Sequence, residues 1–331
     1  MKILITGASG FIGTNLVENY VARGVEVLNF DIDTPRNPPH VAFWRKGDIR
    51  DRNKLVCTVK DFRPDRIINL AAATGAHRPR ANIDSFDTNM AGIKNVIAAA
   101  DSVNTVGRTI FVSSLLVCRH GYIPKTDTEF NANTSYGQSK AAGEMIIRNA
   151  GTRAGEWVIA RPGSVWGPWF ESPYRMFFQM IQRGLYFNVA ELQTVIKPIT
   201  FVGNTAYMLE KLVSAPSEQI ASQVFYLVDQ PQVSVGAWAE LIRRELHARR
   251  FISVPFAVIR TLSKIGDMLQ RLGWDDPPMT SFRLTNMLTG VRHADPKIEA
   301  VVGRLPYSME QGVQITVAWM QKHRHLGRIA N

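Results

Sequence analysis

Three closely spaced glycines follow the first apolar run of the chain. The run at residues 2–6 (KILIT) ends at Gly7, Gly10 and Gly13 follow at three-residue intervals, and a helical pattern begins at Phe11. Glycines at such a turn let backbone N–H groups approach a pyrophosphate, and the start of a helix adds partial positive charge. The spacing is one residue looser than the usual dinucleotide fingerprint. Its place directly after a first strand nevertheless predicts a dinucleotide-binding turn.

The first half of the chain alternates short apolar runs with helical patterns. Near-continuous apolar strands separated by amphipathic helices are typical of a parallel sheet covered on both faces. Right-handed crossovers then predict an α/β fold with a doubly wound, Rossmann-type parallel sheet. The expected strands are residues 2–6, 25–31, 41–44, 66–71, 108–113 and 157–161, and the expected helices are residues 11–23, 53–62, 88–102 and 135–149.

The second half is less regular. Pro and aromatic residues become frequent after Arg161 (RPGSVWGPWFESPY), which predicts a loop leaving the sheet. We expect residues 1–168 to form the dinucleotide-binding domain and residues 169–331 to form a smaller, partly interleaved substrate lobe. Apolar runs at residues 200–202 and 224–228 predict that a segment from about 197 to 229 returns to the first domain.

Composition excludes several classes of protein. With 331 residues, 45% of them hydrophobic, the chain can bury a large core, which argues against general disorder. Cys57 and Cys118 are the only cysteines, so we expect neither a disulfide framework nor a metal site. The sequence opens with neither a secretory signal nor a long apolar run. We therefore expect a cytoplasmic protein.

The charge balance is basic, with 39 Lys and Arg against 28 Asp and Glu and a formal net charge of +11. Such a balance suits nucleic acid, an anionic membrane surface or a polyanionic substrate. The basic residues are scattered, however, with only short pairs such as Arg243 and Arg244. A solvated basic surface is the favoured interpretation, and no nucleic-acid partner is expected.

An acidic residue ends the second expected strand. Asp31 lies about 20 residues after the glycines, where a carboxylate can accept a hydrogen bond from an adenosine ribose 2′-OH. It would repel a 2′-phosphate, so NAD is favoured over NADP. An acid that only closes a turn is the alternative, and Asp33 competes for the role.

Tyr136 and Lys140 lie four residues apart at the start of an expected helix, so their side chains share one face. A tyrosine titrates near ~10 and is a poor base at neutral pH. A nearby ammonium stabilises the phenolate and lowers that pKa. Ser114, at the end of the strand at residues 108–113, could hydrogen-bond the same substrate oxygen. The three residues predict proton transfer to and from a hydroxyl group.

With these motifs in place, the chain resembles the extended short-chain dehydrogenases/reductases of the NAD-dependent epimerase/dehydratase family, which mostly act on nucleotide sugars. The matching residues cover most of the chain. They are 7–13, 31, 47–49, 70–72, 89, 113–114, 136–140, 161–162 and 294–296.

The resemblance implies a role for each motif. Tyr136 would be the general acid/base, Lys140 would tune it and bind the nicotinamide ribose, and Ser114 would orient the substrate oxygen. The residues implied to bind the cofactor are Gly7, Gly10, Phe11, Ile12, Gly13, Asp31, Asp48, Ile49, Leu70, Ala71, Ala72, Tyr136, Lys140 and Pro162. Asp48 and Ile49 would lie by the adenine, and residues 70–72 along the phosphates. A homodimer is also expected.

Departures from the family pattern narrow the range of reactions expected for this chain. Dehydratases of the family have an acid pair after the catalytic hydroxyl, where this chain has Leu115 and Leu116, so a 4,6-dehydratase is disfavoured. Many members have V-Y-G next, where this chain has Val117, Cys118 and Arg119, and a small apolar role for Cys118 is favoured over a reactive thiol. Ser164 replaces a substrate-contacting Asn. These changes bear on the identity of the substrate more than on the chemistry.

A nucleotide diphosphate carries negative charge that arginines bind well. The candidate substrate contacts are His77, Ser164, Arg175, Arg183, Arg283 and Arg292. For each arginine a surface charge is the alternative. Trp169, Tyr174, Phe177 and Phe178 could line a sugar or base pocket, with an aromatic core as the alternative.

A tidy apolar stripe marks the expected helix at residues 256–272. Its members are spaced by four and three residues, and they are Val258, Leu262, Ile265, Leu269 and Leu272. Packing on its own lobe is favoured. A peripheral membrane contact or an oligomer contact stays open.

The sequence therefore predicts an NAD-dependent nucleotide-sugar epimerase that transiently oxidises a hydroxyl group, usually at C4. A 4-keto nucleotide-sugar reductase using NAD(P)H and a hydroxysteroid or small-alcohol dehydrogenase would use the same three residues. A non-catalytic protein that senses NAD or binds RNA is the alternative from a different class. The presence of Ser114, Tyr136 and Lys140 together argues against it.

Overall fold

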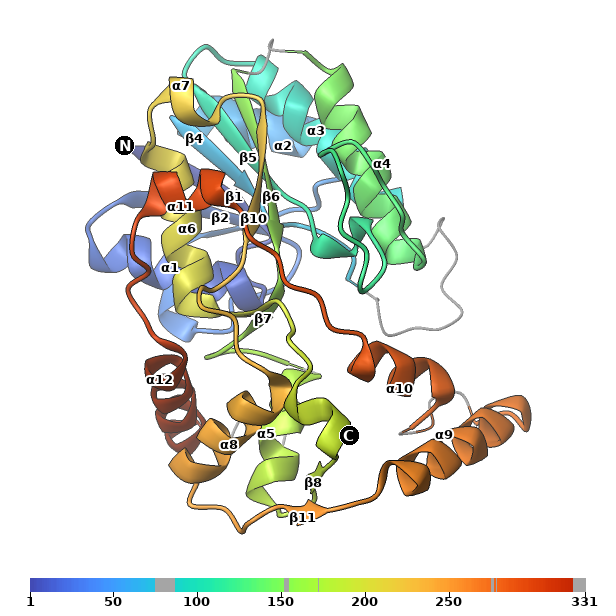
Figure 1. The fold of residues 1–331 in the computed structure, drawn as a ribbon. Helices are drawn as coiled ribbons and strands as arrows, with labels where there is room; N and C mark the ends of the chain where they lie inside the picture. Colours follow the sequence, from blue (N-terminus) through green and yellow to red (C-terminus); the bar gives the residue numbers. More distant parts are fainter. Residues whose placement is uncertain (75–86, 152–154, 172, 275–276, 278, 324–331) are drawn as a thin grey trace.

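A parallel sheet forms the centre of the protein in the computed structural model, which describes residues 1–74, 87–151, 155–171, 173–274, 277 and 279–323 (Figure 1). Its seven strands lie in the order β10-β6-β5-β4-β1-β2-β3, and every pairing is parallel. The chain winds outward from β1 in both directions, which confirms the predicted doubly wound fold. The strands are β1 (Lys2–Thr6), β2 (Glu26–Asp31), β3 (Trp44–Lys46), β4 (Arg66–Asn69), β5 (Arg108–Val112), β6 (Glu156–Pro162) and β10 (Gln223–Leu227).

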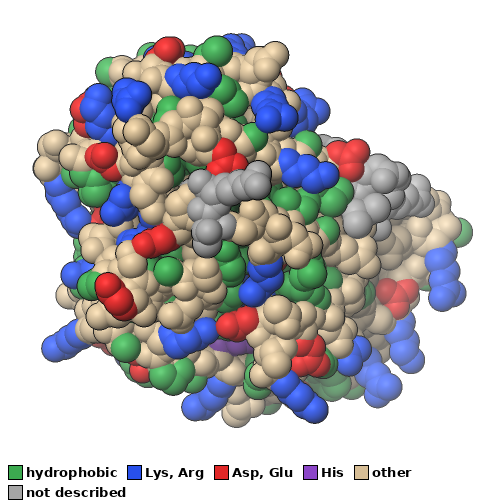
Figure 2. Space-filling model, turned by 90° about the horizontal axis from the view of Figure 1, so that it is seen from above, with side chains coloured by type: hydrophobic (Ala, Val, Ile, Leu, Met, Phe, Trp, Pro, Cys, Tyr) green, Lys and Arg blue, Asp and Glu red, His purple; other side chains and the backbone are tan. Residues whose placement is uncertain are grey.

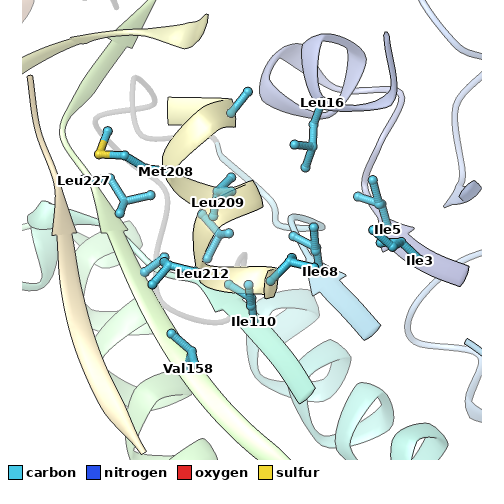
Figure 3. Packing of buried hydrophobic residues seen from close by; sticks show 14 of the residues in the cluster. Ile3, Ile5, Leu16, Ile68, Ile110, Val158, Met208, Leu209, Leu212 and Leu227 are labelled. Carbon is cyan, nitrogen blue, oxygen red and sulfur yellow. The ribbon is translucent and has the colours of Figure 1, made fainter. Parts of the chain in front are cut away.

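Both faces of the sheet are buried. Successive side chains of a strand point to opposite faces, so β1 places Ile3 and Ile5 in one core and Leu4 in the other. The first core lies under α1 (Phe11–Ala22), α6 (Val202–Ser214) and α11 (Pro296–Val302). The second lies under α2 (Arg52–Phe62), α3 (Asp87–Asp101) and α4 (Ser135–Asn149). In Figure 3, Leu209 and Leu212 of α6 lie over the strand residues of the first core.

A second group of elements lies below the sheet in Figure 1 and has an aromatic core. The Trp166 ring contacts Phe178 and Trp238, with centroid distances of 5.8 and 5.2 Å. The helices of this group are α5 (Tyr174–Gln182), α8 (Val235–Glu245) and α12 (Met309–Lys322). Two small sheets pair β7 (Ser164–Trp166) with β9 (Ile199–Phe201) and β8 (Phe187–Asn188) with β11 (Ile252–Ser253).

Two expected strands differ from the structure. The strand expected at residues 41–44 is wrong for its first three residues, because Pro38 and Pro39 start a short 3-10 helix, η1 (Pro38–Phe43). Proline has no N–H to give to a sheet ladder, and its fixed φ suits the first turn of a helix. Of the expected run at residues 200–202, the first two residues belong to β9, which pairs with β7 rather than with the main sheet, and Val202 begins α6. The remaining short helices are η3 (Leu115–Val117), η4 (Ala190–Gln193) and α7 (Ser217–Ile220).

Two helices, α9 (Phe256–Arg271) and α10 (Ser281–Leu288), project at the lower right of Figure 1. The expectation that the apolar stripe of α9 packs on its own lobe is wrong. The buried residues of α9 are Ile259, Ser263 and Gly266. A Cβ on Gly266 would lie 1.7 Å from the Met279 carbonyl oxygen, so this small-residue face is the one that packs. Across the described residues, no helix has both the length and the apolar character to span a bilayer.

Candidate active site

A cavity of about 890 Å³ opens at the carboxyl ends of the central strands. It lies beside β1, where the strand order reverses, which is the usual ligand position in open α/β sheets. The residues expected to bind cofactor or perform catalysis share its wall. They are Gly7, Gly10, Phe11, Ile12, Gly13, Asp31, Asp48, Ile49, Leu70, Ala71, Ala72, Ser114, Tyr136, Lys140 and Pro162.

The glycine turn approaches its neighbours too closely for side chains. Gly7 has a φ of +73°, and a Cβ on it would lie 2.5 Å from the Ala71 nitrogen. A Cβ on Gly13 would lie 2.4 Å from the Ala8 Cα. Gly10 is the N-cap of α1, and among the described residues no side chain caps that helix. The backbone N–H groups at the start of α1 therefore face the cavity as a site for phosphate oxygens.

Asp31 lies at the end of β2 with both carboxylate oxygens held by backbone N–H groups. Oδ2 accepts from Ser9 N at 2.9 Å, and Oδ1 accepts from Asp33 N at 3.0 Å. Burial raises the pKa of Asp31, and the two backbone hydrogen bonds oppose that shift. The carboxylate is thus fixed at the edge of the cavity, where each oxygen can still accept a further hydrogen bond. Asp33 lines the same wall.

The next loops continue the wall of the cavity. Asp48 pairs with Arg50 at 2.6 Å, and that hydrogen bond lowers the pKa of the Asp48 carboxyl group. The loop after β4 is tied to the helices by Asn89, whose Oδ1 accepts from Ala73 N at 2.7 Å. The Asn89 amide also donates to the Ser139 hydroxyl at 2.9 Å. Asn89 therefore positions the 70–73 loop against α4.

Ser114, Tyr136 and Lys140 meet in the wall of the same cavity. The helix α4 begins at Ser135 because the Thr134 hydroxyl caps it, accepting from Gly137 N at 3.1 Å. The side chains of Tyr136 and Ser114 are hydrogen-bonded. The Lys140 Nζ lies 5.8 Å from the Tyr136 ring centroid and donates to the Val112 carbonyl at 2.9 Å. The structure therefore brings the three predicted residues together.

Burial changes the proton affinities of both titratable groups. It raises the pKa of Tyr136 to about 12, although the hydrogen bond with Ser114 opposes the shift. It lowers the pKa of Lys140 to about 8, although the Glu144 carboxylate opposes that shift. At neutral pH the phenol therefore holds its proton and the lysine is largely cationic. Positive charge beside the phenol is what would make it a base.

A buried ion pair supports this part of α4. Arg161 is 0% and Glu144 is 1% exposed, and their closest atoms, Arg161 Nη2 and Glu144 Oε2, are 2.7 Å apart. The same carboxylate accepts from the Ser113 hydroxyl at 2.6 Å. Glu144 thereby connects the end of β5, which carries Ser114, to the helix that carries Tyr136 and Lys140. Sequence reasoning assigned Glu144 no part in the site, because its partners are distant in the chain.

Arg36 is a second residue that sequence reasoning missed. It lines the cavity and joins the loop after β2 to the loop after β7. Its guanidinium donates to the carbonyls of Ser9 at 3.2 Å and Trp169 at 2.8 Å, and it pairs with Glu171 at 2.8 Å. An arginine soon after an acid at the end of β2 was the only local signal available.

The expected substrate contacts do not gather in the cavity wall as the expected cofactor and catalytic residues do. Ser164 hydrogen-bonds the Tyr174 hydroxyl, and Tyr174 lines the cavity. Arg175 on α5 is partly buried, while Arg183 and Arg292 are exposed, and none of these three lines the cavity. The Arg283 guanidinium donates to the Pro277 carbonyl at 2.6 Å. His77 lies outside the described residues, so the substrate contacts stay predictions.

The aromatic candidates divide between core and cavity. Phe178 is fully buried and Trp169 is 9% exposed. Phe177 stacks on Trp238 with ring centroids 5.0 Å apart, so it belongs to the aromatic core. Of the four candidates, Tyr174 is the one in the cavity wall. Among the residues that the structure describes, no group of three His, Cys, Asp or Glu side chains could hold a metal ion.

A family profile and a curated relative match most of this chain. The profile of the NAD dependent epimerase/dehydratase family matches residues 3–207. The N-acetyl-alpha-D-glucosaminyl-diphospho-ditrans,octacis-undecaprenol 4-epimerase of Escherichia coli O157:H7 is 25% identical over 332 aligned positions, which cover 97% of this chain and 96% of that protein.

Solved structures show the same fold. The UDP-glucose 4-epimerase of Thermotoga maritima, solved with UDP-glucose, has a TM-score of 0.74 at 17% identity and covers 97% of this chain and 99% of its own. The dTDP-glucose 4,6-dehydratase of Bacillus anthracis, solved with NAD, has a TM-score of 0.73 at 20% identity and covers 98% of both chains. Because the family profile spans well over half of the sequence and ends within α6, this chain belongs to the NAD-dependent epimerase/dehydratase family.

Proposed function

We propose that this protein is an NAD-dependent nucleotide-sugar epimerase acting at C4. The observation that carries the proposal is the hydrogen-bonded pair of Ser114 and Tyr136, which faces one cavity with the glycine turn. A single cavity could then hold a dinucleotide along the turn and a sugar hydroxyl at the tyrosine. Asp31 favours NAD over NADP because a carboxylate there would repel a 2′-phosphate.

The residues present fit that cofactor. A Cβ at Gly7 or Gly13 would collide with neighbouring backbone, so both positions leave backbone where phosphates approach. The start of α1 supplies N–H donors, and the Asp31 carboxylate supplies an acceptor for a ribose hydroxyl. Lys140 lines the wall near Pro162, on the side where the resemblance places the nicotinamide ribose. When bound, NAD would take a hydride from the sugar carbon and return it.

The side chains of this protein would move the proton. Tyr136 takes the proton of the sugar hydroxyl as the carbon is oxidised and gives it back when the carbonyl is reduced on its other face. Lys140 stabilises the phenolate by its charge. The Ser114 hydroxyl hydrogen-bonds the same sugar oxygen and holds it beside the tyrosine. No second acid is needed, because no water is lost.

Other reactions of the family compete with this proposal. A dehydratase must remove a hydroxyl group from the neighbouring carbon, and Leu115 and Leu116, in η3 directly after Ser114, have no group that can carry a proton. A 4-keto nucleotide-sugar reductase or a small-alcohol dehydrogenase would use the same three residues but exchange its cofactor. The presence of all three residues also disfavours a non-catalytic role.

A sugar carried on a polyprenyl diphosphate is a second candidate substrate. It is favoured by the E. coli relative, whose name specifies such a substrate and whose similarity extends over 97% of this chain. Nucleoside and polyprenyl diphosphates share a sugar and a diphosphate, so the same proton chemistry serves both. A cytoplasmic location and a homodimer stay part of the proposal.

The decisive experiment compares Tyr136→Phe with the wild-type protein on UDP-sugars and on short-chain polyprenyl diphosphate sugars. We expect the variant to lose at least a thousandfold in turnover and to keep bound NAD. Product analysis by NMR separates a C4 epimer from a 4-keto-6-deoxy sugar, which would indicate a dehydratase. Tyr207→Phe is the matched control, because the Tyr207 hydroxyl donates to the Val302 carbonyl outside the cavity. Full activity of Tyr136→Phe would refute the mechanism.

The cofactor is checked separately. Nucleotides released from the denatured wild-type protein are identified by mass spectrometry. NAD near one molecule per chain would support a cofactor that is recycled in place, as an epimerase requires. A protein without bound nucleotide would favour an exchanging reductase or dehydrogenase.

A further inference from the structure

The helix α9 presents an apolar stripe to solvent. Val258 is 45%, Leu262 48% and Ile265 44% exposed, and Leu272, directly after the helix, is 75% exposed. The face of α9 beside the stripe, with Ile259 and Gly266, packs on the neighbouring segments. Removing exposed apolar side chains of this size from water is favourable. A helix whose packed face consists partly of Ser and Gly while its leucines face outward is unusual for a surface helix.

The exposed apolar surface continues beyond the stripe. Met268 is 55%, Trp274 52% and Phe282 59% exposed, so the surface runs from α9 onto α10. We call these residues, together with Val258, Leu262, Ile265 and Leu272, the α9 surface. Continuous apolar patches on a protein usually mark an interaction site.

The same region is basic. Residues 249–292 contain seven Lys and Arg and three Asp, within a chain of net charge +11. On α9 itself, Arg260, Lys264 and Arg271 are exposed and lie on the side away from the stripe. The projection at the right of Figure 2, where Figure 1 places α9, shows Lys and Arg side chains along its edge.

We propose that the α9 surface binds an anionic phospholipid bilayer, with α9 lying in the interface. An amphipathic helix with leucine, isoleucine and tryptophan on one side and lysine and arginine on the other inserts its apolar face among the acyl chains. Long basic side chains reach back to the headgroups, where an anionic surface attracts them. A second copy of this chain is the competing occupant of the stripe, and the vesicle and light-scattering measurements below separate the two.

The α9 surface borders a cavity that also contacts the loop after η3. A second cavity, of about 420 Å³, lies between α10 and the loop that follows η3. Phe282 and Thr285 of α10 form one wall, and Arg119 and His120 form the other. Phe282 belongs to both the α9 surface and this cavity. A bilayer under α9 would therefore lie beside the loop that follows Ser114, which suits a substrate carried in the membrane.

Vesicle binding tests the proposal without reference to the reaction. Purified protein is sedimented with phosphatidylcholine vesicles that contain no or 40% phosphatidylglycerol. We expect binding to the anionic vesicles and at least tenfold weaker binding to the neutral ones, with the difference reduced at high salt. The double variant Leu262→Glu with Ile265→Glu should lose at least tenfold in binding. Val41→Glu is the matched control, because Val41 is 46% exposed on η1 and should bind like the wild-type protein.

A charge variant tests whether the basic residues of α9 contribute to vesicle binding. Arg260→Gln, Lys264→Gln and Arg271→Gln together should weaken binding to anionic vesicles at least tenfold. Equal changes at Arg52, Lys54 and Lys60, exposed residues of α2, should weaken it less. Circular dichroism and thermal unfolding establish that each variant folds, and uncharged Leu262→Gln with Ile265→Gln replaces the Glu pair if it does not.

Three outcomes would overturn the proposal. One is no binding of the wild-type protein to anionic vesicles, and another is binding that the stripe variant leaves unchanged. The third is a wild-type oligomer that dissociates in Leu262→Glu with Ile265→Glu, seen by light scattering, without any vesicle binding. That result would make the α9 surface a contact between copies. Because none of these measurements uses turnover, their failure is distinct from failure of the epimerase assignment.

Discussion

Gly7 lies against Ala71 so closely that a Cβ on the glycine would be 2.5 Å from the Ala71 nitrogen. Gly7 follows β1 and Ala71 follows β4, so this contact sets the separation of two neighbouring strand ends at the cavity. Gly7 also has a φ of +73°, which disfavours any side chain. Two independent constraints therefore act on one residue.

Substitutions at Gly7 and Gly24 separate those constraints. Gly24 has a φ of +68° and nothing within 4 Å of its Cβ position, so Gly24→Ala should cost only about 1–2 kcal/mol of unfolding free energy. Gly7→Ala should cost at least about 2 kcal/mol more, because backbone must also move. Urea unfolding measures both. Equal losses would show that the contact with Ala71 is unimportant.

Asp31 should select the cofactor. Asp31→Asn removes the charge while retaining one acceptor oxygen, so the affinity for NAD should fall by about tenfold or more. NADP should gain relative to NAD, because the repulsion of a 2′-phosphate is removed. Calorimetric titration with both cofactors gives the ratio. Asp33→Asn is the control, and a larger loss of NAD binding in that variant would transfer the role to Asp33.

Lys140 should act through the pKa of Tyr136. Burial raises that pKa to about 12, although the hydrogen bond with Ser114 opposes the shift, and removing the positive charge beside the phenol would disfavour the phenolate further. In Lys140→Met we expect kcat/KM at pH 7 to fall about a hundredfold or more. The rise of kcat/KM with pH should occur at a higher pH in this variant than in the wild-type protein. Lys60→Met, on the exposed side of α2, should keep the wild-type profile, and an unshifted profile in Lys140→Met would contradict the assignment.

Removing only Arg161 from its buried pair with Glu144 should destabilise the protein more than replacing both residues. Arg161→Met leaves a buried carboxylate without its partner, which should lower the unfolding free energy by about 3–5 kcal/mol. Adding Glu144→Gln should restore part of that loss. The exposed pair of Arg244 and Glu240 is the control, and Arg244→Met should cost less than about 1 kcal/mol. If the double variant is no more stable than Arg161→Met, the buried charge is not the cause.

Asp229 should make stability depend on pH. It is 5% exposed, and burial raises its pKa to about 7, although hydrogen bonds from Phe201 N and Asn204 oppose the shift. The folded state therefore binds one proton more than the unfolded state between pH 4 and 7, and its stability falls as pH rises through that window. The fall should be about 1.4 kcal/mol per pH unit and should level off above pH 7. In Asp229→Asn, unfolding curves should lack this fall in stability between pH 4 and 7. If the unfolding free energy has the same slope with pH in both proteins, another group causes the fall.

Much of the fold was predictable because its signals are local. The alternation of apolar runs and helices indicates a buried parallel sheet, and the glycines at residues 7–13 mark its first turn. The error at residues 41–44 arose because two prolines override an apolar run. The apolar stripe of α9 correctly predicted a helix but not which residues are buried. Periodicity shows that a helix has an apolar face, and it does not show whether other segments cover that face.

The sequence by itself determined the doubly wound sheet, the glycine turn and the shared face of Tyr136 and Lys140, since each depends on residues within one turn or one strand of each other. Only the tertiary structure decided which distant segments meet. Ser114 reaches Tyr136, Glu144 reaches Arg161, and Arg36 reaches the loop after β7, across separations set by strand order and packing. It also decided that α9 packs through Ile259, Ser263 and Gly266, because small side chains let the helix approach the Met279 backbone, which leaves its larger side chains in solvent.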